Sequence, residues 1–499
     1  MHKVLTFDAA CGTIYCIAGL TARRRKMKKI LRAAVSVLTA AVMAVSSVPT
    51  AGAETETPYY IRILSKNVNI RSGPGTKYKI KGKTGGAGSF TYLGAQFDDF
   101  DILWYKLEDK TGFTGWVSSD VSRRYMKKSA MPEIDKAEEY ESDGTAYSEI
   151  MSMVYDAADS ANAIGVQVAA IRGSDGRVFD WTWGYSKYGE KAMGNATKIR
   201  AASISKVAVA ICAVKMQEQG ILDINKKISK YWGEKMPQPV SLATLLTHTS
   251  SLAYLSVQTD REKLLEKLTS VSSYTGAKIG SAAAWMYNNF GTSVAAATLE
   301  VASDTVLEDY AQDNIFKPLG VDMSFFSGNI EKQSRLATLY EADHGVELIP
   351  GEAKYIVPDG VVGNNSGNYV GGLTGSARDV AKMFYMLAND GKFKGEQVLA
   401  PESVETLEKR YFTAEEYGGK FKQCITLRYG KNRYGTSGVY YHTGNAYGVI
   451  ALASYDPQTK NTVVVFTTGA SHERDSDGVY KVCSAITEAV YRNIDSIES

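Results

Sequence analysis

The chain has 499 residues, of which 44% are hydrophobic and 22% charged, with 45 Gly and 11 Pro. This length predicts two or three domains with a large buried core, and the composition excludes disorder, collagen-like repeats and low-complexity sequence. The formal charge of +3 is uneven, because residues 1–53 carry eight Lys and Arg against one acid and so hold +7, which leaves −4 for the other 446 residues. A negative net charge on these 446 residues gives no electrostatic reason to expect nucleic-acid binding.

The basic N-terminal region has the pattern of an export signal. Lys28, Lys29 and Arg32 precede the uncharged run 33–45, and the sequence Ala-Gly-Ala follows at 51–53 as a cleavage site. We predict a signal peptide at 1–53 and a secreted, extracellular product, with Met27 as an alternative start of translation. An uncleaved anchor is the other reading, although the run is shorter than the roughly 20 residues of a membrane span, and no later segment is apolar enough to be one.

The rest of the chain changes character twice. Residues 54–121 consist of short strand-like pieces broken by Gly, which predicts a small β-barrel. Residues 122–145 are charged and poor in large apolar side chains, as a linker is. Residues 146–499 have strand patterns at both ends and helical patterns between them, which predicts an α+β fold with one antiparallel sheet closed by the two ends, flanked by helices, and a helical subdomain.

Cysteine usage predicts no metal site. After cleavage Cys212, Cys424 and Cys483 remain, and their wide spacing fits neither a zinc pattern nor a disulfide framework. A single Cys424–Cys483 bond stays open at this point. The chain also has no G-x-S-x-G, H-E-x-x-H or Walker motif, which removes support for elbow hydrolases, zinc proteases and nucleotide-dependent enzymes.

The strongest chemical signal is an S-x-x-K at Ser203 and Lys206. If a helix begins at Ser203, the two side chains are one turn apart on the same face. A serine hydroxyl needs a neighbouring base, and a lysine in the apolar run VAVAICAV would lose enough hydration for its pKa to fall toward neutrality. The Ser203 N–H at the first helical turn would serve an oxyanion hole. Helix capping is the alternative role of Ser203.

The flanks of this motif carry a family resemblance. The sequence reads KIRAASISKVAVAICAVKMQEQGILDINKKISKYW and then SLATLLTHTSSL. Over about 150–499 it resembles the serine hydrolase family of class C β-lactamases, D-alanyl-D-alanine peptidases and related esterases, with Ser251 in place of the usual Gly. The resemblance implies a β-lactamase/transpeptidase-like fold and acyl-enzyme chemistry that needs no metal or cofactor. It also implies that His248 fastens a loop and is not a catalytic base.

The family's second motif, Y-x-N, is found at Tyr287-Asn288-Asn289. The resemblance implies that Tyr287 lies near Lys206 and shares its proton transfer, with the phenolate favoured by the ammonium group. It implies that Asn289 presents its amide to the acyl side chain of the substrate.

The third motif is a strand that borders the site, and it corresponds to His442-Thr443-Gly444. Two K-T-G sequences, at 83–85 and 110–112, precede the nucleophile and are interpreted as turns. The resemblance places a second oxyanion donor at the N–H of Asn445, and Gly444 would let this backbone approach the substrate closely. The histidine at this position is mostly neutral at pH 7. In having it, the sequence resembles the peptidase and esterase branches of the family more than efficient β-lactamases. The cations available for a substrate carboxylate would be Arg428, Lys431 and Arg433.

The N-terminal pieces NVNIRSGPGTKYKI, LWYKL and GFTGWVSSD resemble the bacterial SH3-like domain. That family binds cell-wall peptides or packs against an enzyme partner. Whether its two tryptophans line a groove or belong to the core stays open. The matching positions are Asn69, Arg71, Gly73, Pro74, Trp104, Gly115 and Trp116.

Together these features predict a secreted, cell-wall-associated serine hydrolase that acts through an acyl-enzyme on peptidoglycan peptides. The preferred activities are those of a D-Ala-D-Ala carboxypeptidase or a D-amino-acid peptidase. A β-lactamase acting on β-lactam-like small substrates and an esterase are alternatives with the same mechanism. A non-catalytic penicillin-binding or wall-sensing protein is the alternative of another class.

Overall fold

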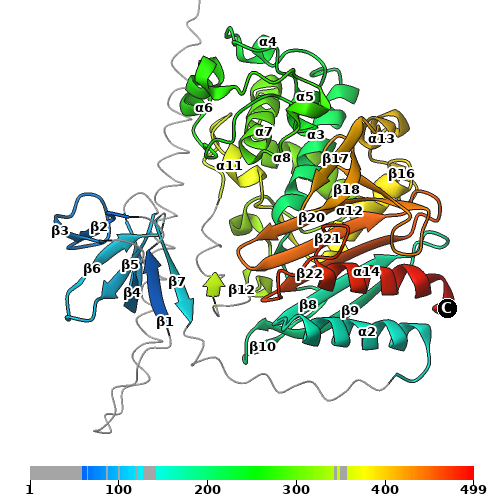
Figure 1. Cartoon of the computed structure of the whole chain (residues 1–499), viewed down its shortest axis with the longest axis horizontal. Coiled ribbons are helices and arrows are strands. Elements are labelled where there is room, and N and C mark those ends of the chain that lie inside the picture. The colour runs from blue at the N-terminus through cyan, green and yellow to red at the C-terminus, as the bar shows by residue number, and fades with distance from the viewer. Residues whose placement is uncertain are drawn as a thin grey trace, which may run out of the picture. The chain divides into compact units, whose positions relative to one another are not determined.

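A computed structural model describes residues 59–63, 66–85, 88–98, 102–119, 121–126, 142–341, 346–348 and 357–498 (Figure 1). The predicted signal peptide, 1–53, lies outside the described residues, as does most of the predicted linker, 122–145. Across the described segments, no helix is both long and apolar enough to span a bilayer.

The first described part is a small antiparallel β-structure. Its inward-facing side chains alternate along the strands and form a separate apolar core that includes Ile61, Ile70, Leu107 and Val117. The described strands pair in the order β3-β2-β6-β5-β4-β1-β7. They are β1 (Tyr59–Ile63), β2 (Asn69–Arg71), β3 (Ile80–Lys83), β4 (Ser89–Phe97), β5 (Leu103–Glu108), β6 (Thr114–Ser118) and β7 (Ser122–Met126).

Strand β7 corrects the predicted start of the linker. It pairs antiparallel with β1 over its whole length, from Tyr59 opposite Met126 to Ile63 opposite Ser122. The small β-structure therefore continues to Met126, and the prediction that a linker begins at 122 is wrong. The polar sequence SRRYM satisfies its main chain through the pairing with β1, although its composition resembles a linker.

The larger part is built on one antiparallel sheet, as predicted. Its described strands run in the order β10-β9-β8-β22-β21-β20-β19-β18-β17. Strand β22, near the C-terminus, pairs with β8, near the start of the domain, so the two ends of this part close the sheet. The strands are β8 (Gly165–Ile171), β9 (Val178–Lys187), β10 (Lys191–Ala192), β17 (Phe412–Glu416), β18 (Gly419–Gln423), β19 (Arg428–Lys431), β20 (Gly438–Ala446), β21 (Val449–Tyr455) and β22 (Thr462–Thr468).

Both faces of this sheet are covered, which explains why its central strands are apolar in sequence. In β22, Val463 and Val465 belong to the core under helices α2 (Ala146–Ser160) and α14 (Lys481–Asn493). The alternate residues Val464 and Phe466 belong to the core on the opposite face, which includes α3 (Ser205–Glu218) and α12 (Ala377–Ala388). Burial on both sides removes the polar alternation that a half-exposed strand would show.

The opposite face carries a large helical layer (Figure 1). Its short strands β11 (Ile199–Arg200) and β14 (Thr374–Gly375) pair with each other, and β12 (Leu339–Glu341) pairs with β13 (Val346–Leu348). A further hairpin joins β15 (Lys392–Phe393) to β16 (Glu396–Gln397). The helices are α3 (Ser205–Glu218), α4 (Ser229–Trp232), α5 (Leu242–Leu246), α6 (Arg261–Thr269), α7 (Asn289–Ser303), α8 (Leu307–Ala311), α9 (Lys317–Leu319), α11 (Ser366–Tyr369), α12 (Ala377–Ala388) and α13 (Pro401–Glu408), with a π-helical turn at Gln312–Phe316.

The three cysteines that the structure describes are core residues. Cys212, Cys424 and Cys483 are all free and buried, so the disulfide left open by the sequence does not form. Among the described residues there is also no cluster of three His, Cys, Asp or Glu side chains that could hold a metal ion.

Candidate active site

The site is built around the turn that follows β11. The Ala201 N–H donates to the carbonyl of Leu373 at 2.7 Å, and Ala202 then adopts a left-handed φ of +48°. That conformation is unfavourable for a residue with a Cβ and is held in place by the surrounding structure. A 3₁₀ turn covers Ala202–Ile204 and runs directly into α3, which begins at Ser205, so Ser203 lies in the 3₁₀ turn and is one turn away from Lys206.

The Lys206 ammonium is held between two neutral oxygens. Its Nζ lies 3.0 Å from Ser203 Oγ and 2.9 Å from the carbonyl oxygen of Val370, and the residue is 1% exposed. Burial lowers the pKa of Lys206 to about 7, helped by the Arg428 charge and opposed by Glu416. Since that pKa is near neutrality, a large fraction of the amine is free to accept the proton of Ser203 at pH 7.

A second serine of the motif has a structural role. Ser205 Oγ donates to the Ala202 carbonyl at 2.5 Å and accepts from the Leu373 N–H at 3.0 Å. It therefore fastens the nucleophile turn to the segment that follows α11. The carbonyl of Val370, in that same segment, orients Lys206. No sequence signal points to Val370, because a main-chain acceptor does not depend on the side chain at its position.

Tyr287 contacts both members of the motif. Its ring centre lies 5.2 Å from Lys206 Nζ, and the Ser203 hydroxyl acts on the pKa of the Tyr287 hydroxyl, which it lowers. Burial raises the pKa of Tyr287 to about 12 and outweighs the effects of Ser203 and of the Arg428 charge. The expectation that the phenolate is favoured is therefore wrong, and Tyr287 acts as a neutral phenol.

His248 holds the loop that carries Tyr287. Its Nδ1 accepts from the Asn288 N–H at 3.3 Å, its carbonyl accepts from the Met286 N–H at 2.9 Å, and its ring centre is 4.7 Å from that of Tyr287. Burial lowers the pKa of His248 to about 3, so the imidazole is neutral. These contacts confirm a loop-fastening role.

The two asparagines of the Y-x-N motif differ. Asn288 is buried, donates to the Leu252 and Ala253 carbonyls, and caps α7 by accepting from the Gly291 N–H at 3.1 Å. Asn289 begins α7 and is half-buried, and its amide makes no hydrogen bond to any residue that the structure describes. Asn289 is thus the member of the pair with hydrogen-bonding capacity left for a ligand.

Strand β20 borders the nucleophile turn. Its neighbour β19 pairs with it only as far as Arg428 opposite Tyr441, so among the described strands nothing covers the edge of β20 from His442 onward. A Cβ added at Gly444 would lie 2.7 Å from the Ala201 carbonyl, so glycine is needed for the close approach of β20 to the nucleophile turn. The expected approach of this backbone to a substrate stays a prediction. The exposed Asn445 continues the edge, and its side chain donates to the Tyr480 hydroxyl.

His442 is buried and neutral, and the half-buried Thr443 follows it. Burial lowers the pKa of His442 well below its usual range, as do the charges of Arg428 and Lys206. Its Nδ1 lies 2.7 Å from the Thr443 carbonyl and, since a carbonyl only accepts, must be the protonated nitrogen. Its ring centre is 6.5 Å from that of Tyr287.

One of the three predicted cations reaches this cluster. The Arg428 guanidinium is centred 5.7 Å from the Tyr287 ring and forms an ion pair of 2.6 Å with Glu416. Arg433 instead packs over Tyr441, in the core on the α14 side of the sheet, and Lys431 is exposed at the end of β19. The Arg428–Glu416 pair was not foreseen from sequence, because it joins two strands whose register is set by the fold.

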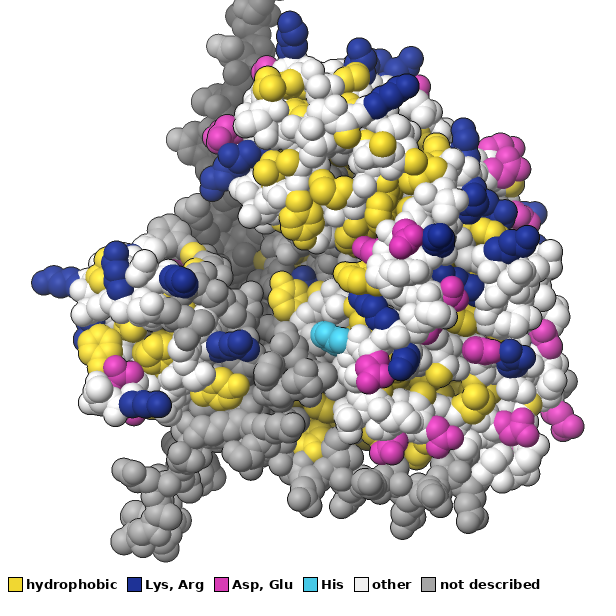
Figure 2. Space-filling model, viewed as in Figure 1, with side chains coloured by type: hydrophobic (Ala, Val, Ile, Leu, Met, Phe, Trp, Pro, Cys, Tyr) yellow, Lys and Arg dark blue, Asp and Glu magenta, His cyan; other side chains and the backbone are white. Residues whose placement is uncertain are grey.

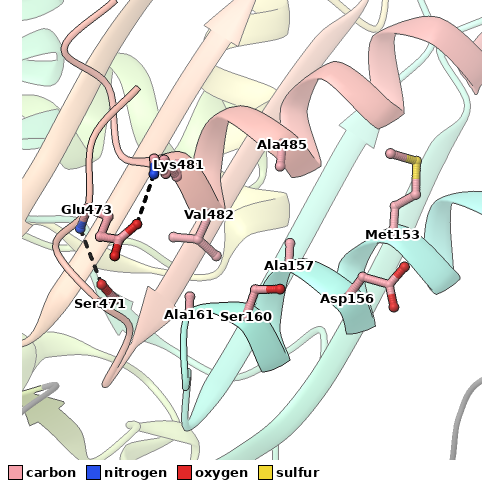
Figure 3. A pocket seen from close by; sticks show the side chains of 10 residues that line it. All are labelled: Met153, Asp156, Ala157, Ser160, Ala161, Ser471, Glu473, Lys481, Val482 and Ala485. Atoms are coloured by element: carbon pink, nitrogen blue, oxygen red, sulfur yellow. Dashed lines mark hydrogen bonds and ion pairs between the residues drawn. The ribbon is translucent and has the colours of Figure 1, made fainter. Parts of the chain in front are cut away.

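A separate surface pocket of about 310 Å³ lies between α2 and α14 and contains none of these residues (Figure 3). Several of its lining side chains are small, and two of the lining residues, Lys481 and Glu473, form an ion pair of 2.9 Å. It is lined by Met153, Asp156, Ala157, Ser160, Ala161, Ser471, Glu473, Lys481, Val482 and Ala485.

In the small β-structure the two tryptophans differ. Trp104 is 3% exposed and its indole N–H donates to Asp98 at 2.9 Å, so it belongs to the interior. Trp116 is half-buried and lies opposite Arg71 and Lys106 on the neighbouring strands. The K-T-G at 110–112 lies in the β5–β6 turn, as predicted. The K-T-G at 83–85 begins with the last residue of β3, and the Thr84 N–H donates to the Val68 carbonyl, so the prediction of a turn is not confirmed there.

Comparison with known proteins agrees with this geometry. Residues 150–483 match the beta-lactamase family and residues 66–122 match the bacterial SH3 domain. A comparison with curated protein sequences found no match. Similar solved structures include a penicillin-binding protein homologue from Pyrococcus abyssi, with 22% identity over 69% of this chain and 76% of that one and a TM-score of 0.55.

Two further structures cover nearly the whole of their own chains. The D-amino acid amidase from Ochrobactrum anthropi SV3 has 19% identity over 70% of this chain and 98% of its own, with a TM-score of 0.53. A class C beta lactamase from Rhodobacter sphaeroides has 16% identity over 70% and 99%, with a TM-score of 0.54. Identities this low show a shared fold, whereas the family match spans more than half of the chain. The chain therefore belongs to the beta-lactamase family of serine hydrolases and carries a bacterial SH3 domain before its hydrolase domain.

Proposed function

We propose that the protein is a secreted, cell-wall-associated serine hydrolase that acts through an acyl-enzyme on D-amino-acid peptides or amides. The observation that carries this proposal is the 3.0 Å contact between Ser203 Oγ and a Lys206 amine whose pKa is about 7. A hydroxyl beside a largely neutral amine has both the nucleophile and the base that acyl transfer needs.

In the proposed reaction, Ser203 Oγ attacks the substrate carbonyl while its proton passes to Lys206. The carbonyl oxygen takes up negative charge and is stabilised by the N–H groups of Ser203 and Asn445. The bond to the leaving amine or alcohol then breaks, and the leaving group takes the proton from Lys206 by way of the Tyr287 hydroxyl. Water hydrolyses the ester on Ser203 by the same proton path in reverse, which restores the free enzyme.

The substrate class is supported by the surroundings of this site. The edge of β20 from His442 to Asn445, which no described strand covers, can pair with an extended peptide, and the Asn289 amide is available to its acyl side chain. The similar D-amino acid amidase and the SH3 domain together favour a D-amino-acid substrate found in the cell wall.

The proposal is tested by acylation with a neutral ester of Nα-acetyl-D-alanine. After a rapid acid quench, intact mass and peptide mapping should find the acetyl-D-alanyl group on Ser203, and Ser203→Ala should give none. The exposed Ser272 provides the control Ser272→Ala, which should behave as wild type. Equal turnover by wild type and Ser203→Ala would overturn the nucleophile assignment, and no acylation at all would favour the non-catalytic alternative.

A β-lactamase is the second candidate, favoured by the family match. The same quench with a labelled penicillin separates the two. Rapid formation and loss of a penicilloyl adduct on Ser203 would identify a β-lactamase. A slow or persistent adduct beside fast turnover of D-alanyl substrates would identify a peptidase or amidase.

We also propose that the SH3 domain binds the cell wall through Trp116, the half-buried tryptophan beside Arg71 and Lys106. Sedimentation of the full chain with purified walls should be weakened by Trp116→Ala. The control Tyr417→Ala removes an aromatic side chain that is 65% exposed on the hydrolase domain and should leave sedimentation unchanged.

A further inference from the structure

Recognition of a substrate that ends in a free carboxylate requires a cation or several donors beside the reacting carbonyl, because the charge must be compensated when water is displaced. Two cationic side chains surround Tyr287, namely Lys206 and Arg428. Lys206 is hydrogen-bonded to Ser203 Oγ and the Val370 carbonyl, and its amine is needed to accept the Ser203 proton. Arg428 is therefore the group on which carboxylate recognition at this end of the site would depend.

Arg428 already has a carboxylate partner. Its Nη2 lies 2.6 Å from Glu416 Oε2, at the end of β17, and the two side chains are 8% and 19% exposed. The rest of the guanidinium packs against Phe421, 4.4 Å from the ring centre. A substrate carboxylate that took Arg428 would have to leave Glu416 as an unpaired, mostly buried charge, and breaking a buried pair in this way is strongly unfavourable.

His442 cannot replace Arg428 in this role. Its Nδ1–H is used by the Thr443 carbonyl, so the neutral ring presents only the lone pair of Nε2, which repels a carboxylate oxygen. Nε2 is also buried and has no hydrogen-bond partner among the described residues. The motif position that could have carried a lysine ammonium thus holds a group without charge and without a free donor.

On the other side of the nucleophile turn, Arg200 is engaged as well. Its Nε donates to the Gly371 carbonyl at 2.7 Å, and its guanidinium stacks 4.3 Å from the centre of the Tyr447 ring. On the face of the hydrolase domain seen in Figure 2, basic and acidic side chains are interspersed, so that face presents no broad positive field to attract anions.

We propose that Glu416 acts as a built-in substitute for a substrate carboxylate, so that the enzyme selects acyl substrates whose leaving group is neutral. Amides and esters without a free carboxylate at that end would be preferred over peptides that end in one. Glu416 is then a specificity-determining residue, acting through Arg428. This inference rests on the proposed acyl transfer by Ser203 and narrows it toward an amidase or esterase and away from a carboxypeptidase or a β-lactamase.

The test compares two esters of Nα-acetyl-D-alanine that differ only in the charge of the leaving group, the 3-carbamoylphenyl and the 3-carboxyphenyl ester. Their sizes and leaving-group strengths are similar, so the ratio of their kcat/KM values reports the charge preference. The wild-type full chain should favour the carbamoyl ester by about tenfold or more, because the substrate carboxylate must compete with the buried Glu416 for Arg428.

Glu416→Gln should free Arg428 and reduce this ratio by about tenfold, mainly through a gain with the carboxyphenyl ester. Any change in the basicity of Lys206 affects both esters alike and cancels in the ratio. The control Glu415→Gln alters the preceding residue of β17, whose side chain is 58% exposed, and should leave the ratio unchanged.

A wild-type ratio near one, or one that favours the carboxyphenyl ester, would overturn the inference without any variant. So would a ratio that stays the same in a folded Glu416→Gln protein. These results differ from failure of the proposed function, in which neither ester acylates Ser203.

Discussion

Two lysines near the nucleophile show how the same side chain takes opposite roles. Lys198, just before β11, and Lys206, in α3, are both nearly excluded from solvent, with exposures of 4% and 1%. Lys198 Nζ lies 2.7 Å from an Asp379 carboxylate oxygen and 3.2 Å from one of Asp322. The hydrogen-bond partners of Lys206 among the described residues are instead a hydroxyl and a carbonyl. A buried lysine with carboxylate partners is stabilised as an ammonium and cross-links the segments that carry them. A buried lysine without such partners loses its proton more easily and can act as a base.

The largest expected effect is the loss of that base. Lys206→Met keeps the length and apolar stem of the side chain and removes the amine, so the rate of acylation by a neutral D-alanyl ester should fall by about 10²–10⁴-fold. Single-turnover kinetics with the ester would measure it. A rate within a few-fold of wild type would show that the proton of Ser203 goes elsewhere.

The same variant should not lose stability. The pKa of Lys206 is about 7 in the folded chain, below its ordinary value of 10.5, so unfolding takes up a proton between these pH values. The wild type should therefore gain unfolding free energy relative to Lys206→Met as pH rises from 7 toward 10.5, in denaturant titrations at several pH values. The opposite slope would mean that Lys206 is charged in the folded protein.

Lys198→Met should lower the stability and leave the acylation rate nearly unchanged, the reverse of the effects expected for Lys206→Met. It leaves the Asp379 carboxylate, 10% exposed, without its ammonium partner, and breaking such a buried pair typically costs about 3–5 kcal/mol. Urea unfolding at pH 7 would show this loss, while the acylation rate of the remaining folded protein should stay within a few-fold of wild type. A stable but inactive variant would contradict the division of roles between the two lysines.

The sequence predicted those parts of the structure in which residue type and spacing carry the information. The apolar runs of β20, β21 and β22 are predictable because both faces of the sheet are covered. The spacing of Ser203 and Lys206 is a chemical requirement, and it is readable although Ser203 lies in a 3₁₀ turn before α3. The backbone of that turn has no signal in the sequence, because Ala202 adopts a left-handed conformation usually associated with glycine.

The features that were missed depend on contacts between distant segments. Val370 acts through its carbonyl, Ser205 through a contact with Leu373, and Glu416 through its meeting with Arg428 across the sheet. Each partner is ordinary by itself in the sequence. Only the paired register of the strands and the packing of α11 bring them to the nucleophile.

A pH profile sharpens the contrast between the two lysines. Because the Lys206 amine must be neutral to accept the proton, the acylation rate should rise by about tenfold between pH 6 and pH 8, with a midpoint near 7. Tyr287, with a pKa of about 12, and His248, with one of about 3, do not titrate in this interval. Tyr287→Phe should thus lower the rate and leave the midpoint unchanged. A moved midpoint would assign the titration to the tyrosine.

The smallest expected effect concerns the charges that surround Lys206. Glu416 favours the ammonium form of Lys206 and Arg428 disfavours it, so Glu416→Gln should move the midpoint of the acylation profile to lower pH, by less than about one unit. Glu415→Gln, one residue earlier and mostly exposed, should leave it in place because solvent screens its charge. A shift to higher pH would mean that Glu416 acts on Lys206 through geometry rather than charge. A shift to lower pH would show that Glu416, which pairs with Arg428, also sets the fraction of Lys206 that is a neutral amine at a given pH. The preference for substrate charge and the pH dependence of acylation would then both depend on the Arg428–Glu416 ion pair.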